Sequence, residues 1–191
     1  VLDDASLYCW GNNGNGQTDV PALVNPTHVS VGYWHTCALD AVGVKCWGRN
    51  DGSQIISATD AAAPSLRNPT QVSVDPYGDT RRVCVLDDLG VACWRASDGY
   101  RYLPGSGIPS ALQREVGNPT QVSGASCALA DADGDGVAEV VCWGANDYGQ
   151  TDVPTDLVNP VAIDAGWYHT CAIDDNGLHC WGWNNICDYS C

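Results

Sequence analysis

A short motif, Cys-Ala-Leu-Asp-x-x-Gly-Val-x-Cys-Trp-Gly, recurs along the sequence, and its two cysteines stand at facing ends of a predicted β-hairpin. Copies begin at Cys37, Cys84 and Cys171, a copy with an enlarged turn begins at Cys127, and the first residues form a copy without its first cysteine. Successive copies begin roughly 45 residues apart, the span of one propeller blade or one solenoid turn. We expect one repeat domain over residues 1–191, with hairpins at 1–11, 37–48, 84–94, 127–144 and 171–182.

Each repeat is expected to supply four short β segments. Segments such as 68–74 begin with Asn-Pro and are expected to be extended. The proline fixes its own φ, and we expect it to push the preceding asparagine into the β region. The second strand carries the first cysteine, Asp and Gly form a tight turn, and the third strand carries Cys-Trp-Gly. The segments 13–21 and 146–154 then lead to an outermost strand, and 55–67 and 97–116 are interpreted as surface excursions with one short helix at most.

Alternation along the third strand sends its cysteine to one face of the sheet and its tryptophan to the other. The tryptophans of the repeats are therefore expected to form a layer between adjacent sheets: Trp10, Trp47, Trp94, Trp143 and Trp181.

The chain has 11 cysteines, a number that indicates an oxidising, extracellular or cell-surface location. Facing residues of a hairpin lie about 4.5 to 5.5 Å apart, within reach of a disulfide. The expected pairs are Cys37–Cys46, Cys84–Cys93, Cys127–Cys142 and Cys171–Cys180. Zinc binding is disfavoured because Cys-x8-Cys lacks the short spacing of zinc knuckles.

Cys9, Cys187 and Cys191 remain outside these pairs, and the sequence does not determine their partners. If a cysteine precedes Val1, it would pair with Cys9 and leave Cys187 and Cys191 to each other. The other pairing joins Cys9 to Cys187 or Cys191, which would fasten the chain ends or link two subunits.

The formal net charge of −15 and the pI near 4.1 argue against nucleic acid as a partner, because phosphates need a basic surface. They argue equally against docking on anionic lipid. The sequence shows no leader peptide and no apolar run that could insert into a membrane. We interpret the chain as a mature product or an excised segment.

The enlarged turn at 131–139 carries carboxylates at alternate positions. Asp131, Asp133, Asp135, the backbone carbonyl of Val137, and Glu139 take positions 1, 3, 5, 7 and 9 of a calcium loop, with glycine at position 6. The loop resembles the calcium loops of integrin α-subunit propellers, with Glu139 in place of the final aspartate. Without a cation, the three aspartates would repel one another. We expect a structural Ca²⁺ ion here, with a solvated polar turn as the alternative.

Two aromatic pairs, Tyr33-Trp34 and Trp167-Tyr168, lie on strand connections and are better candidates for a ligand-facing surface than the repeated tryptophans, although packing is the favoured explanation here too. The four histidines form no zinc or catalytic motif: His28, His35, His169 and His179. No nucleophile elbow, phosphate loop or zinc-protease helix occurs, so the chain is not expected to be an enzyme.

The assembled consensus, Val-Ser-Val-Gly-x-x-His-Thr-Cys-Ala-Leu-Asp-x-x-Gly-Val-x-Cys-Trp-Gly-x-Asn-x-x-Gly-Gln, resembles the repeat of the regulator of chromosome condensation family, in its secreted, cysteine-bearing bacterial branch. The match is tightest over 9–50 and 142–184. The resemblance implies an all-β propeller of four-stranded blades. It implies no single function, because members include a nucleotide-exchange factor, a β-lactamase inhibitor and surface proteins.

The chain holds about five such blades, fewer than the familiar rings of the family. We expect the ring to be incomplete or closed by neighbouring chains, with a smaller ring closed by the five hairpins as the alternative, because an open propeller exposes apolar sheet faces. The first functional hypothesis is a non-catalytic extracellular structural or adhesive protein that self-associates into a fibre through its open ends. The alternative is a secreted propeller segment that binds a protein or glycan partner through its blade loops.

Overall fold

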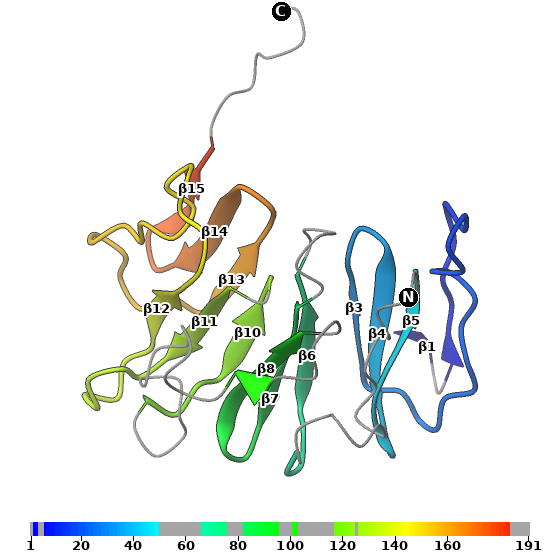
Figure 1. Cartoon of the computed structure of the whole chain (residues 1–191). Coiled ribbons are helices and arrows are strands. Elements are labelled where there is room, and N and C mark those ends of the chain that lie inside the picture. The colour runs from blue at the N-terminus through cyan, green and yellow to red at the C-terminus, as the bar shows by residue number, and fades with distance from the viewer. Residues whose placement is uncertain are drawn as a thin grey trace, which may run out of the picture.

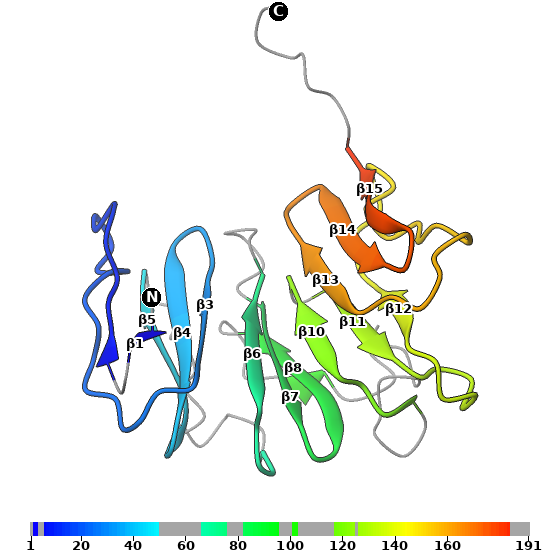
Figure 2. The same ribbon diagram turned by 180° about the vertical axis from the view of Figure 1, so that it is seen from behind.

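The computed structural model describes residues 2–3, 6–49, 66–75, 82–95, 101–102, 117–124 and 126–183. Its strands form five antiparallel sheets that follow one another in chain order along an arc (Figures 1 and 2). None of the described segments is an apolar helix of membrane-spanning length. The all-β prediction is confirmed. The excursions at 55–67 and 97–116 lie almost wholly outside the described residues, as do Cys187 and Cys191.

Four of the sheets correspond to the predicted repeats, and we call them blades. The first blade holds β3 (His28–Val31), β4 (His35–Asp40) and β5 (Gly43–Gly48). The second holds β6 (Gln71–Val74), β7 (Arg82–Asp87), β8 (Gly90–Arg95) and β9 (Arg101–Tyr102). The third holds β10 (Gln121–Ser123), β11 (Cys127–Ala130) and β12 (Glu139–Cys142). The fourth holds β13 (Ala162–Ala165), β14 (His169–Asp174) and β15 (Gly177–Gly182).

A short hairpin of β1 (Leu2–Asp3) and β2 (Ser6–Leu7) precedes the first blade. Among the described strands, only the second blade has a fourth, because β9 pairs with β8. The expectation of four strands in every blade is therefore met in one sheet.

The four predicted disulfides are present, each within one hairpin: Cys37–Cys46, Cys84–Cys93, Cys127–Cys142 and Cys171–Cys180. The paired cysteines stand directly opposite each other in the strand register, with Cα atoms 4.0 to 4.1 Å apart. Cys9 has no disulfide partner among the described residues. The bridges therefore stiffen single blades and do not tie one blade to another.

Neighbouring blades pack through two unlike faces. The face of the first blade that carries Cys37, Leu39 and Val44 packs on the face of the second blade that carries Val83 and Trp94. The same pairing recurs between the second and third blades and between the third and fourth. We call these the cystine face and the indole face. The predicted tryptophan layer is confirmed at Trp94 and Trp143, both buried.

Polar side chains on the innermost strands join the blades edge to edge. The Gln121 side chain on β10 accepts a hydrogen bond from the backbone N–H of Ile163 on β13 (3.0 Å) and donates one to its carbonyl (2.9 Å). Ser123 Oγ accepts the N–H of Ala165 (3.0 Å). Earlier blades repeat this pattern, with Val122 N–H bound to Gln71 Oε1, Val74 N–H to Ser30 Oγ and Val72 N–H to His28 Nδ1. Backbone groups that face the next blade are thus satisfied.

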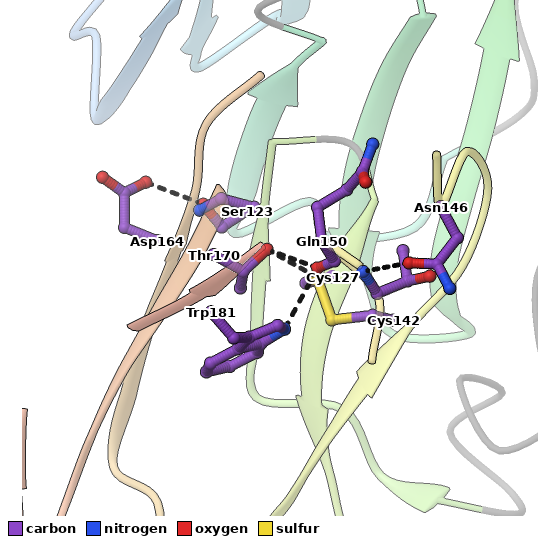
Figure 3. Close-up of a disulfide and its surroundings, with 10 residues drawn as sticks. Ser123, Cys127, Cys142, Asn146, Gln150, Asp164, Thr170 and Trp181 are labelled. Atoms are coloured by element: carbon purple, nitrogen blue, oxygen red, sulfur yellow. Dashed lines mark hydrogen bonds between the residues drawn. A yellow bond between two sulfur atoms is a disulfide. The ribbon is translucent and has the colours of Figure 1, made fainter. Parts of the chain in front are cut away.

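The segments 13–21 and 146–154 form turns, and the outermost strand to which they were expected to lead is not formed in residues 22–27 or 155–161. The carbonyl of Gln17 accepts hydrogen bonds from Thr36 Oγ1 (2.9 Å) and Trp47 Nε1 (3.1 Å) of the hairpin that follows it. Gln150 makes the same two bonds with Thr170 and Trp181 (Figure 3). Each segment therefore packs on the outer side of the next blade, where indole and hydroxyl donors hold it.

The asparagines that precede proline at the start of each repeat are left-handed, which corrects the expectation of a β conformation. The φ angles of Asn25, Asn68, Asn118 and Asn159 lie between +36° and +50°. Asparagine is among the few residues that tolerate this region. The amide nitrogen of Asn159 donates to Asp175, which compensates the local cost. Two hydrogen bonds flank the turn. The N–H of Val158 donates to the carboxylate of Asp174, and the N–H of Val161 donates to the carbonyl of Ile173.

The aspartate that closes the Cys-Ala-Leu-Asp sequence caps two loops at once. Asp40 accepts the N–H groups of Val42 and Gly43 in the hairpin turn and that of Val24 in the preceding loop. Burial raises the pKa of Asp40, but these donors and Lys45 outweigh it and hold the pKa below its ordinary value. Asp174 repeats the arrangement.

Candidate functional site

The enlarged turn between β11 and β12 brings three carboxylates together. Ligand oxygens of Asp131, Asp133 and Asp135 all lie within 4.8 Å of one another. The turn is shaped by N–H groups bound to these carboxylates, including Gly134 and Gly136 to Asp131. Both glycines have positive φ, which lets the chain wrap around the oxygens.

The other two predicted calcium ligands are placed differently. Glu139 begins β12, opposite Ala130, and its Oε2 accepts the N–H of Ala132 at 3.2 Å. It is not part of the cluster of three carboxylates. Val137 follows the cluster, and its N–H is bound to Asp135. The structure thus gathers three of the five predicted ligands directly.

Six aromatic rings form a continuous surface at one end of the blades, and they come from loops far apart in sequence. Tyr33 on the β3–β4 loop lies 6.3 Å from Trp167 on the β13–β14 loop, ring centroid to ring centroid. We call the set the aromatic surface: Tyr33, Trp34, Tyr148, Trp167, Tyr168 and Trp183. Four of the rings are well exposed, Tyr33 at 57% and Trp167 at 42% among them. The guanidinium of Arg49 lies over the Trp34 ring at 5.4 Å.

A hollow of about 410 Å³ adjoins this surface. The rings of Trp143, Tyr148, Trp167 and Tyr168 line it, together with the polar side chains of Asp75, Arg82 and Asp147. The sequence pointed to Trp167-Tyr168 as ligand-facing, but it gave no signal for the part that Tyr148 and Trp143 play. Their proximity depends on the packing of the third blade on the fourth.

The histidines serve structural contacts. His28 accepts the N–H of Val72, and its burial lowers its pKa. His35 is buried, and His179 Nε2 lies 3.1 Å from Asp174. Among the described residues, the only grouping of three or more His, Cys, Asp or Glu with metal-binding spacing is the aspartate cluster.

The two ends of the stack expose unlike faces. On the fourth blade, Ile173 and Leu178 of the cystine face are 47% and 69% exposed. At the other end, Trp10 after β2 is 73% exposed, whereas the equivalent Trp94 is fully buried. Figure 1 shows these ends at opposite extremes of the arc.

The repeat pattern and the architecture both have counterparts among known proteins. Residues 27–54 and 161–185 match the family model described as the Regulator of chromosome condensation (RCC1) repeat. No match to this sequence was found among curated proteins.

Solved structures with the same architecture include two plant receptor-kinase ectodomains. The ectodomain of CR4 from Physcomitrella patens superposes with a TM-score of 0.60 at 21% identity, covering 94% of this chain and 47% of that one. The CRINKLY WD40 ectodomain of ACR4 from Arabidopsis thaliana gives 0.58 at 23% identity, covering 92% and 59%. Prp20p from Saccharomyces cerevisiae, described with its binding to Gsp1p and histones, gives 0.53 at 16% identity, covering 87% and 47%.

At these identities the likeness shows the fold, and this chain spans about half the length of the structures it resembles. Both matched segments hold the same order of strands and turn glycine, and both end in Cys-Trp-Gly. Two segments of the chain, 27–54 and 161–185, therefore match the regulator of chromosome condensation repeat, and the described sheets stack in the manner of propeller blades.

Proposed function

We propose that this chain is a non-catalytic, extracellular structural or adhesive protein whose copies associate head to tail, cystine face on indole face. The observation that carries the proposal is the exposure of Leu178 and Ile173, which belong to a face that is buried in every earlier blade. The four disulfides and the receptor-ectodomain likeness support an extracellular location.

The repeats provide internal controls for this exposure. Leu39 and Val44 occupy the equivalent positions in the first blade, and each is at most 2% exposed. In the second and third blades, the equivalent pairs Leu86–Val91 and Leu129–Val140 are also buried. Full burial of such a side chain is worth about 1.5 to 3 kcal/mol. The exposed face of the fourth blade therefore has a strong thermodynamic reason to be covered.

The chemistry of the covering surface follows from the internal interfaces. In all three, a cystine face meets an indole face that carries tryptophan with valine, alanine or isoleucine. Trp10 offers the same kind of indole at the opposite end of the chain. Contact between unlike ends is heterologous, so it either closes a ring or propagates as a filament.

Light scattering of the protein after size exclusion, together with negative-stain images, tests the proposal. The wild-type chain is expected to give a mass of two or more copies that rises with concentration. Leu178→Asp and Trp10→Ala are expected to give monomers, whereas Val42→Asp, an equally exposed change at a hairpin tip, leaves the mass unchanged. A wild-type chain that stays monomeric at high concentration overturns the proposal.

A structural calcium ion in the aspartate cluster is the second part of the proposal. Three carboxylates within 4.8 Å of one another are poorly compatible without a counter-ion, and their oxygens suit a hard cation. Asp131, Asp133 and Asp135 would supply side-chain oxygens, with Val137 and Glu139 completing the set. The ion would rigidify the enlarged hairpin of the third blade.

Calorimetric titration with CaCl₂ is expected to show one saturable site that Asp133→Ala abolishes. Asp156→Ala, on an exposed turn outside the cluster, serves as the control and is expected to bind like wild type. If titration of the folded wild-type chain with CaCl₂ gives no heat of binding, the calcium proposal is contradicted. The association proposal does not depend on this result.

A protein or glycan partner is the alternative function. Prp20p binds Gsp1p and histones, and this makes a protein partner reasonable for a chain of the same fold. Pull-down by immobilised monomeric Leu178→Asp protein would favour this alternative, because that variant removes the proposed self-contact.

A further inference from the structure

The hollow beside the aromatic surface lies where the third repeat departs from the first and fourth. In the first and fourth blades, the loop between the first two strands carries Tyr33-Trp34 and Trp167-Tyr168. In the third blade, the same loop shrinks to residues 124–126, because Ser123 pairs directly with Cys127. The missing aromatic side chains leave open space, which Gly124 and Ser126 line.

The floor of the hollow tolerates no larger residue at Gly124. A Cβ atom there would stand 2.3 Å from the carbonyl oxygen of Ala165, and its φ of +56° disfavours a side chain. The close approach of the residue after β10 to Ala165 at the end of β13 therefore requires glycine.

The lining combines aromatic faces with negative charge. Trp167 and Tyr168 are stacked with centroids 5.0 Å apart at 20°, and Tyr148 lies 4.5 Å from Tyr168. Asp147 lines the same hollow and makes no hydrogen bond or ion pair with the described residues. Asp75 and Arg82 also line it, but both are engaged in other contacts.

This chemistry selects an organic cation. The faces of tryptophan and tyrosine attract a cationic group through the ring quadrupole, and desolvation strengthens the attraction. The carboxylate of Asp147 and the formal net charge of −15 also attract a cation. Arg49 over Trp34 shows that this surface already accepts a cation from the chain itself. An anionic ligand would face an excess of carboxylates.

We propose that the hollow is a binding site for an organic cation of the quaternary ammonium class, held between Trp167, Tyr148 and Asp147. Its volume lies within the range of small-molecule sites, about 300 to 1,000 Å³. The site is independent of the self-association surface, because Leu178 and Trp10 do not line it.

Choline chloride is the probe, measured by calorimetry and by ligand-observed NMR on the full chain. The matched control ligand is 3,3-dimethylbutan-1-ol, which has the shape of choline without its charge. Choline is expected to bind saturably, the neutral alcohol at least about tenfold more weakly, and higher ionic strength to weaken choline binding.

Three variants locate the site. Trp167→Ala and Asp147→Asn are expected to weaken choline binding, the former about tenfold, whereas Trp167→Phe recovers part of the affinity. Trp10→Ala, at a residue that does not line the hollow, is expected to bind choline like wild type. Thermal unfolding confirms that each variant is folded, which is expected because Trp167 and Asp147 are exposed.

Any one of three results overturns the proposal. These are binding of the neutral alcohol as tight as that of choline, binding of choline by Trp167→Ala like wild type, and saturable binding of neutral sugars such as glucose in place of choline. Competition by a lysine-rich peptide tests whether the site also takes cationic side chains of proteins. If it competes with choline, the site accepts protein side chains as well, and if it does not, the site is specific for the quaternary ammonium group; both results support cation binding.

Discussion

Leu178 of β15 occupies the same register position as Val44 of β5, yet Leu178 is 69% exposed and Val44 is fully buried. Both face the strand before them across a cystine-clamped hairpin, at the pairs Ile173–Leu178 and Leu39–Val44. The difference lies in the neighbour, because the second blade covers Val44. The stability of one repeat therefore depends on the next, as expected for quasi-one-dimensional architectures.

Polar coupling between blades can be measured at Gln121. Its side chain satisfies both the N–H and the carbonyl of Ile163. Gln121→Leu leaves the two backbone groups without these partners and is expected to lower the free energy of unfolding by about 1 to 3 kcal/mol in chemical denaturation. Gln121→Glu retains only the acceptor and is expected to fall between the leucine variant and wild type. Equal stability of all three proteins would show that water replaces the side chain.

The left-handed turn before Pro160 gives a second test. Asn159 has φ +50°, where glycine is unstrained and alanine is penalised by about 1 to 2 kcal/mol. Asn159→Ala is expected to lower the unfolding free energy by at least that amount, since it also loses the hydrogen bond to Asp175. Asn159→Gly should lose less. If alanine and glycine proved equal in thermal unfolding, the left-handed conformation would not limit stability.

The sequence predicted what local periodicity and spacing determine. Hairpin positions, the facing cysteines and the alternation of cystine and indole follow from strand geometry, and all are present. The conformation of Asn159 was predicted wrongly, because the rule for residues before proline ignores the two flanking hydrogen bonds that force a turn. The docking of Gln17 on Trp47 and the meeting of Tyr33 with Trp167 depend on packing between distant segments, which no local pattern encodes.

Acid should weaken the hairpin caps. The pKa of Asp40 lies below its ordinary value, as does that of Asp174, where the N–H of Val158 is the largest cause. A lowered folded-state pKa stabilises the fold above the ordinary value of 3.8, and this contribution disappears as the pH falls through the folded-state pKa. Asp40→Asn is therefore expected to be less stable than wild type at pH 6, with the difference shrinking below pH 3.8. A difference independent of pH would contradict the lowered pKa.

Reduction should open the four disulfides in an order set by exposure. Cys84 and Cys93 are fully buried between blades, whereas Cys180 lies on the uncovered cystine face of the fourth blade. Because exchange requires access to the sulfur, limited treatment with a thiol reductant followed by alkylation and mass spectrometry is expected to label Cys171 and Cys180 first. Head-to-tail association would cover that face, so labelling of this pair should slow as protein concentration rises. In monomeric Leu178→Asp the labelling rate should not depend on protein concentration. A concentration effect in that variant would show that something other than the proposed contact protects the disulfide.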